Sequence, residues 1–223
     1  MTTPTFGIIW DMDGTLVDTA EHHHIAWRNA ANSAGRNFSQ QDFANTFGHR
    51  NPEIIKYLFG SAMSEKDGEE LSNRKEQEYR DAISKHGVSL LPGARELIED
   101  FHRNGHLQAI GTSAPRANLE QILKQTNISS FFAATVTGQD TQRGKPNPEV
   151  FLKAASILNI APNKCVVFED AEAGIKAAKA AGMRCVGVCT GGHSSAEDLK
   201  SVGADLIVPN LTRINRDIII GLF

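Results

Sequence analysis

The chain lacks several features that would place it in a specialised class of protein. Its three cysteines, Cys165, Cys185 and Cys189, are odd in number and too few for a disulfide framework in 223 residues, so we expect reduced thiols. No apolar stretch approaches the roughly 20 residues that span a bilayer. The first residues also lack the basic segment of a secretory signal. We therefore expect a cytoplasmic protein.

Neither sign of charge is in excess. The 23 basic and 26 acidic residues give a net charge of −3, which offers no basic surface to nucleic acid or to an anionic membrane. We expect no partner of either kind. Hydrophobic residues make up 40% of the chain and charged residues 22%, as in ordinary globular domains, so disorder, collagen and coiled coil are excluded.

Short apolar runs alternate with helical patterns beyond residue 90. Each run is too short for a helix and does not alternate cleanly, which is typical of strands covered on both faces. Together with one run at the start of the chain, they cover residues 6–10, 107–110, 134–136, 165–168, 185–188 and 206–208. Alternation of strand and helix predicts an α/β fold with a doubly wound parallel sheet.

The segment between the first two predicted strands breaks this rhythm. It contains no good strand, and helical patterns run over residues 21–33, 52–58 and 65–85. This pattern predicts an inserted helical cap over residues 19–88, with residues 1–18 and 89–223 forming the core. Ligands of open α/β sheets bind at the carboxyl ends of the strands, so such a cap would cover the site.

Side chains suited to phosphate chemistry stand where the predicted strands end. They comprise four carboxylates, a hydroxyl and an ammonium, which is the set that Mg²⁺-assisted phosphoryl transfer through an aspartyl-phosphate needs. Because the carboxyl ends of parallel strands lie at one edge of a sheet, the fold would gather them. The candidates are Asp11, Asp13, Thr112, Lys145, Glu169 and Asp170.

Two non-catalytic roles have to be considered for the acidic turn at residues 11–18 when it is taken alone. A calcium loop of the EF-hand type is excluded, because the twelfth position is His22 rather than a glutamate and the sixth is Leu16 rather than glycine. A turn that merely caps the next helix stays open for this segment by itself. The other candidates, which follow in order along the chain, favour catalysis.

These residues resemble the four ordered motifs of the haloacid dehalogenase superfamily. The segments 145–149 and 168–175 are similar to its phosphatase and mutase branch, in particular to β-phosphoglucomutase-like members. The resemblance extends over essentially the whole chain. It implies a three-layer Rossmann-like core with an inserted helical cap domain.

The resemblance also implies a role for each core residue. Asp11 would be the nucleophile and Asp13 the general acid and base, while Thr112 would bind the phosphoryl oxygens and Lys145 would hold Asp11. Asp13 favours phosphate esters as substrates, since an alkoxide leaving group needs a proton. We expect Asp13 to have the higher pKa of the two aspartates. The implied Mg²⁺ ligands are Asp11, the backbone carbonyl of Asp13, Glu169 and Asp170.

The helical segment is most similar to that of β-phosphoglucomutase. The similarity implies that His23 assists the acid–base aspartate, that Lys75 reaches the sugar and that Arg50 binds a distal phosphate. A mutase that works through a sugar bisphosphate needs such a second cationic site. A phosphatase needs only one phosphate site.

The loop after Thr112 departs from the mutase pattern. Ser113 and Arg116 are candidates for binding substrate, but Ala114 lacks a hydroxyl that the family tends to have and Pro115 stands where a lysine would fall. Arg116 would restore that positive charge from the next position. We therefore favour hydrolysis of small phosphorylated metabolites, such as sugar phosphates, and keep β-phosphoglucomutase activity as the alternative.

Two classes of non-enzyme are less consistent with the sequence. A signalling receiver domain also uses an aspartate, Mg²⁺ and a lysine, but its phosphorylated residue follows the third strand and it carries no helical insert. A binding protein that has lost its chemistry is disfavoured because every motif residue is present. No sustained apolar stripe is left over once the core helices are assigned, so we expect a monomer.

Overall fold

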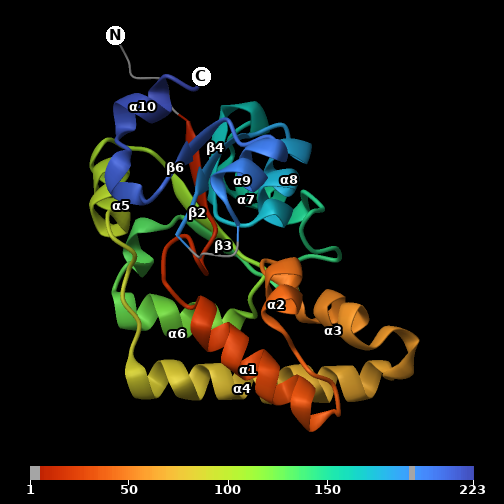
Figure 1. Cartoon of the computed structure of the whole chain (residues 1–223). Coiled ribbons are helices and arrows are strands. Elements are labelled where there is room, and N and C mark those ends of the chain that lie inside the picture. Colours follow the sequence, from red (N-terminus) through yellow and green to blue (C-terminus); the bar gives the residue numbers. More distant parts are fainter. Residues whose placement is uncertain (1–5, 191–193) are drawn as a thin grey trace.

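The computed structural model of the chain describes residues 6–190 and 194–223. It contains a six-stranded sheet in the order β3-β2-β1-β4-β5-β6 (Figure 1). All neighbouring strands are parallel. The strands are β1 (Gly7–Trp10), β2 (Gln108–Gly111), β3 (Ala134–Val136), β4 (Cys165–Glu169), β5 (Arg184–Val188) and β6 (Leu206–Val208). The predicted α/β sheet is confirmed, and each strand agrees with its predicted bounds to within one residue at either end.

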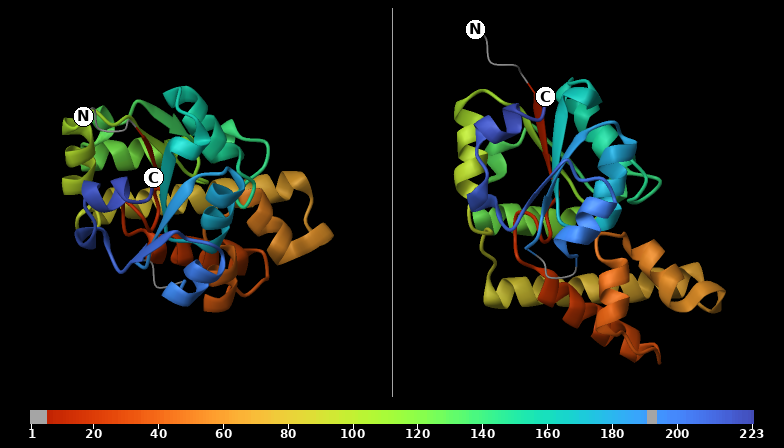
Figure 2. Two further views of the ribbon diagram at one scale, coloured as in Figure 1. Left: turned by 90° about the horizontal axis from the view of Figure 1, so that it is seen from above. Right: turned by 45° about the horizontal axis from the view of Figure 1, so that its top comes forward.

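Helices cover both faces of the sheet, as Figure 2 shows from two further directions. Ile8 and Trp10 of β1 pack in the apolar cluster of α5 (Ala94–Arg103), α6 (Arg116–Thr126) and α10 (Arg216–Ile220). Ile9 points the other way, into the cluster of α7 (Glu149–Leu158), α8 (Glu172–Ala180) and α9 (Ala196–Ser201). Burial on both faces explains why the strands are continuous apolar runs.

A helical insert, by which we mean residues 20–86, lies between β1 and β2 in the chain. In Figure 1 it lies below the carboxyl ends of the strands. It consists of α1 (Ala20–Ser33), α2 (Gln40–Thr46), α3 (Asn51–Phe59) and α4 (Glu65–His86). It has an apolar cluster of its own, built around Trp27, Phe38 and Leu71. The insert therefore has its own packing and covers the edge of the sheet where the candidate residues stand.

Five short 3-10 helices complete the secondary structure of the described residues. They are η1 (Gly60–Ala62), η2 (Ser129–Phe131), η3 (Gly138–Asp140), η4 (Pro162–Lys164) and η5 (Leu211–Arg213). All three cysteines are free thiols. In the part of the chain that the structure describes, no helix is both long and apolar enough to cross a membrane.

Candidate active site

Parallel pairing of the strands brings the candidate residues of the core together. Trp10 is in register with Ile110 of β2 and with Phe168 of β4. The residues that follow these positions therefore lie at one edge, with Asp11 after β1, Thr112 after β2 and Glu169 at the end of β4. Their order along the chain differs from their order in the sheet, so only the folded topology makes them neighbours.

A buried ammonium links two of these carboxylates. The Nζ atom of Lys145 lies 2.5 Å from Oδ1 of Asp11 and 2.6 Å from Oε1 of Glu169. Burial lowers the pKa of Lys145, but the charges of Asp11 and Glu169 outweigh it, and the pKa is raised above its usual value. Lys145 therefore stays cationic, as a buried charge can when it is paired and hydrogen-bonded.

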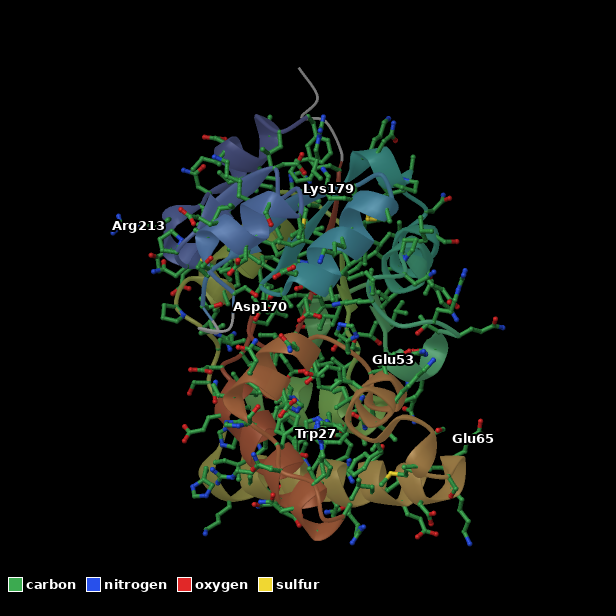
Figure 3. All side chains as sticks on the ribbon, turned by 45° about the vertical axis from the view of Figure 1, so that its right-hand side comes forward. Trp27, Glu53, Glu65, Asp170, Lys179 and Arg213 are labelled. Atoms are coloured by element: carbon green, nitrogen blue, oxygen red, sulfur yellow. The ribbon has the colours of Figure 1, made fainter. Side chains whose placement is uncertain are left out.

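Three carboxylates could hold a divalent cation. Asp11, Glu169 and Asp170 each offer an oxygen within 4.8 Å of the others, and all three are buried. The second oxygen of Glu169 accepts hydrogen bonds from two backbone N–H groups, those of Asp170 and Ala171, both at 2.8 Å. Three hard oxygen ligands in a fixed arrangement suit Mg²⁺. Asp170 is labelled in Figure 3, at the end of the core that faces the insert.

A glycine makes room for this cluster. Gly14 has a φ of +83°, and a Cβ atom there would come within 1.8 Å of Oδ2 of Asp170. Its N–H donates to the carbonyl of Val17 at 2.8 Å, which closes the turn after β1. Both the left-handed backbone and the close approach require glycine at this position.

The two aspartates of the turn have pKa values shifted in opposite directions. Burial raises the pKa of Asp11 well above its usual value, and the nearby Glu169 and Asp170 add to this against the opposing effect of Lys145. Burial alone would also raise the pKa of Asp13, but His23 and other insert groups outweigh it, so that this pKa is lowered. The expected order relies on a Mg²⁺ ion beside Asp11 as well as on Lys145, and it stays a prediction for the metal-bound site.

Three side chains surround Oδ1 of Asp13. The hydroxyl of Thr19 donates to it at 2.6 Å and that of Tyr79 at 3.2 Å. The Nε2 atom of His23 lies 3.2 Å away. His23 was predicted to lie beside Asp13 and is found there, while its part in catalysis stays a prediction. Thr19 and Tyr79 were not assigned a role, although Tyr79 lies one helical turn after Lys75 and thus on the same face of α4.

Lys75 determines the orientation of the His23 ring. Its Nζ atom lies 2.8 Å from Nδ1 of His23 and 2.9 Å from Oε1 of Glu76, and the side chain is buried. An ammonium can only donate, so Nδ1 accepts and the proton of the neutral ring is on Nε2. Lys75 thus directs the N–H of His23 toward Asp13.

Arg50 is placed away from this group. Its guanidinium lies 2.5 Å from Oε1 of Glu53. It also donates to the carbonyls of Thr141 at 2.8 Å and Gln142 at 3.0 Å. These contacts join the insert to the loop before Lys145. The binding of a distal phosphate by Arg50 stays a prediction.

Ser113 and Arg116 lie in different surroundings. Ser113 is close to the site, and its hydroxyl donates to the carbonyl of Gly48 in the insert at 2.6 Å. Arg116 pairs with Asp140 at 2.6 Å, and 41% of its side chain is exposed. The structure thus gathers Ser113 with the core candidates and leaves Arg116 at the surface of α6.

A cavity of about 50 Å³ lies between the core and the insert. The core contributes catalytic candidates to its lining, and the insert contributes aromatic and polar side chains. Glu76 and Asn51 also line it, although no sequence pattern indicated a role for either residue. The lining includes Asp11, Asp13, Thr112, Ser113, His23, Trp27, Phe43, Phe47, Asn51, Lys75 and Glu76.

The chain is similar to known proteins in sequence and in structure. Residues 8–188 match the family model of haloacid dehalogenase-like hydrolases. The chain is 35% identical over 207 residues to beta-phosphoglucomutase of Bacillus subtilis, a match that covers 90% of this chain and 88% of that protein. It is 31% identical over 176 residues to phosphorylated carbohydrates phosphatase of Thermotoga maritima, covering 79% and 81%. The solved structure of beta-phosphoglucomutase from Clostridium difficile superposes with a TM-score of 0.88 at 27% identity, covering 98% and 97%.

Proposed function

The chain belongs to the haloacid dehalogenase-like hydrolases, and from this premise we propose that it is a Mg²⁺-dependent phosphatase of small phosphorylated metabolites such as sugar phosphates. The observation that carries the proposal is the pair Asp11 and Asp13 on one turn. Asp11 is held by Lys145, and Asp13 is held by Thr19 directly before the insert and by Tyr79 within it. A reacting phosphate between core and insert would contact both carboxylates.

The core would bind the phosphoryl group. A Mg²⁺ ion held by Asp11, the backbone carbonyl of Asp13, Glu169 and Asp170 would neutralise negative charge on the phosphoryl oxygens. The buried hydroxyl of Thr112 accepts the N–H of Ala114 at 3.1 Å, so its own proton is available to a phosphoryl oxygen. Lys145 supplies a fixed positive charge beside Asp11.

The reaction would take place in two steps on this chain's own residues. A carboxylate oxygen of Asp11 attacks phosphorus and the bond to the alcohol oxygen breaks, while Asp13 gives that oxygen a proton. A water molecule then gives a proton to Asp13 and attacks the aspartyl-phosphate, which releases phosphate and restores Asp11.

Proton transfer at Asp13 would use its second oxygen. The contacts that hold Asp13 all involve Oδ1, so we assign the transfer to Oδ2. Asp13 must be protonated when it meets the leaving oxygen. A bound phosphate dianion beside it would raise the pKa of Asp13, because two like charges disfavour ionisation.

The insert would act as the cap. We propose residues 19–88 as the cap domain and residues 1–18 and 89–223 as the catalytic core. The cavity between them is too small for a sugar phosphate, so the cap would open to admit substrate and close to exclude bulk water. That the protein is monomeric and cytoplasmic stays a prediction.

β-Phosphoglucomutase activity is the second candidate, and the similarity to the mutases of Bacillus subtilis and Clostridium difficile favours it. One reaction distinguishes the two. The protein is incubated with Mg²⁺, β-glucose 1-phosphate and a trace of β-glucose 1,6-bisphosphate, and glucose 6-phosphate and free phosphate are both assayed. Glucose 6-phosphate without free phosphate would establish the mutase. Release of phosphate from this sugar, or from other small phosphate esters, would establish the phosphatase.

A further inference from the structure

Glu76 is a buried carboxylate that faces the cavity. It lies on α4, is 4% exposed and lines the space between core and insert. Its burial raises its pKa, but Lys75, His23 and the hydrogen bond from Asn118 outweigh this and lower the pKa to about 2. A carboxylate in such surroundings stays ionised, and the reaction proposed above does not use it.

The hydrogen bonds of Glu76 leave it able to accept one more. Oε1 accepts from Lys75 at 2.9 Å and from the amide of Asn51 at 2.9 Å. Oε2 accepts from the amide of Asn118 at 2.6 Å. A carboxylate has about four acceptor positions, so one position on Oε2 remains for a donor in the cavity. An ionised carboxylate can only accept, which suits a hydroxyl group.

Glu76 also changes the charge that the cavity presents. Among the described residues that line it, Lys75 is the only lysine or arginine. Its ammonium is paired with Glu76, and the guanidinium of Arg50, outside the cavity, is paired with Glu53. Within the described lining of the cavity, the insert therefore offers a second phosphate no lysine or arginine without a carboxylate beside it.

The remaining lining of the insert suits the carbon skeleton of a polyol. Trp27, Phe43 and Phe47 line the cavity with aromatic surface, and the Trp27 ring lies 5.3 Å from the Nζ atom of Lys75. Apolar surface with a few fixed polar groups is the usual lining of a small-molecule site.

We propose that Glu76 determines the substrate class, which is the monophosphate of a sugar or polyol. Its carboxylate accepts a hydrogen bond from a hydroxyl of the leaving alcohol and repels a second phosphate. This inference rests on the proposed phosphatase function. It assigns the discrimination between monophosphates and bisphosphates to one residue of the insert.

Calorimetry on a background that cannot turn over substrate provides the test. In the Asp11→Asn protein with Mg²⁺, we compare the Kd values of fructose 1-phosphate and fructose 1,6-bisphosphate, with and without Glu76→Gln. With Glu76 present, we expect the monophosphate to bind at least about tenfold more tightly than the bisphosphate. Glu76→Gln tightens binding of the bisphosphate by about tenfold and changes the Kd of the monophosphate by less than about threefold.

Tighter binding of one ligand is a result that structural damage would not produce. Glu76→Asp keeps the charge and should keep the preference for the monophosphate. Glu78→Gln is the matched control. Glu78 lies two residues after Glu76, its side chain accepts a hydrogen bond from Asn29 outside the cavity, and its substitution should change neither Kd. Equal Kd values for the two sugars with Glu76 present, or a preference that survives Glu76→Gln, would overturn the inference.

A separate assay reports on the proposed function alone. Proteins with native Asp11 are tested on para-nitrophenyl phosphate, which carries no hydroxyl group for Glu76 to bind. We expect the native chain and the Glu78→Gln control to hydrolyse it at rates within about threefold of each other. No hydrolysis by the native chain would contradict the phosphatase function, while the calorimetry decides the role of Glu76 independently.

Discussion

The two charged clusters of this molecule are built in different ways. In the core, Lys145 pairs with Asp11 and Glu169, which are 134 and 24 residues away in the chain. In the insert, Lys75 pairs with the next residue, Glu76, and Arg50 pairs with a glutamate three residues on. The core cluster depends on the topology of the sheet, whereas the pairs of the insert depend on neighbours in the sequence.

This difference matches the two proposed roles, in which the core cluster carries out the reaction and the insert pairs select the substrate. Under the proposed function, a change to the core cluster would remove the nucleophile, a metal ligand or the charge that holds them. A single substitution beside Lys75 changes the charge that the insert presents to the substrate and leaves the core cluster intact. Relatives of this chain include both a mutase and a phosphatase, and one fold can carry different functions when the residues of its site differ.

The largest effect should follow removal of Asp11, the proposed nucleophile in the core. We expect Asp11→Asn to lower kcat by about 10⁴-fold or more, since the covalent step is lost. The fold should remain, because the substitution removes one of several neighbouring buried carboxylates whose charge is unfavourable there. Phosphate release and thermal unfolding measure the two outcomes. Asp18→Asn, at an exposed position of the same turn, is the control. Retained turnover in Asp11→Asn would contradict the proposed mechanism.

The next largest effect should come from filling the space beside Asp170, a proposed metal ligand. Gly14→Ala would place a methyl group 1.8 Å from Oδ2 of Asp170, which must move. We expect a loss of Mg²⁺ affinity and a fall in kcat/KM of about 10²-fold or more. Gly105→Ala is the matched control, since Gly105 has a φ of +76° and nothing within 4 Å of an added Cβ.

The two glycine variants differ in steric contact but share a left-handed backbone. Both should lose about 1 kcal/mol of unfolding free energy from that conformation. Only Gly14→Ala should affect Mg²⁺ binding, as measured by calorimetry. Equal Mg²⁺ affinity in the two variants would show that the contact with Asp170 is relieved without moving a ligand.

The local pair of the insert should contribute to stability in a pH-dependent way. The pKa of Glu76 is lowered to about 2 in the folded protein from a usual 4.5, so its contribution is fully present above about pH 4.5 and is lost as the pH falls toward 2. The shift corresponds to about 3 kcal/mol at neutral pH. Glu76→Gln should therefore be less stable than the native chain at pH 7, and roughly half of this difference should be gone at pH 3.

Urea unfolding at the two pH values measures this difference. Glu78→Gln, on the same helix, corrects for the removal of an acidic residue from α4. A difference between native chain and Glu76→Gln that is the same at pH 7 and pH 3 would mean that the charge of Glu76 does not stabilise the fold.

The sequence was most informative about features that depend on the burial of strands and on their parallel arrangement. The six strands were predicted to within one residue at each end because burial on both faces makes them continuous apolar runs. The meeting of Asp11, Thr112 and Glu169 followed from the rule that parallel strands end at one edge. Neither prediction depended on the conformation of a single side chain.

The insert was less predictable for physical reasons. Helix α2 was not predicted, although Ser39 and Asp42 form a capping box at its start. Arg50 can extend toward a ligand or fold back onto Glu53, and the sequence does not distinguish these rotamers. The hydrogen bonds of Tyr79 to Asp13 and of Asn118 to Glu76 join distant segments, and no local pattern indicates them.

The smallest effect should come from a basic residue outside the cavity. The sequence predicts that Arg116 supplies the positive charge absent at Pro115, which would make Arg116→Ala raise KM severalfold. In the structure Arg116 pairs with Asp140 and is 41% exposed, and exposed pairs of this kind contribute little. We therefore expect Arg116→Ala to change KM and kcat by less than about twofold on a sugar monophosphate. Steady-state kinetics of Arg116→Ala and Arg116→Lys decide between the two. A severalfold rise in KM for alanine that lysine reverses would show that Arg116 leaves Asp140 to bind the substrate, and that the core, like the insert, contributes to specificity through a single local charge.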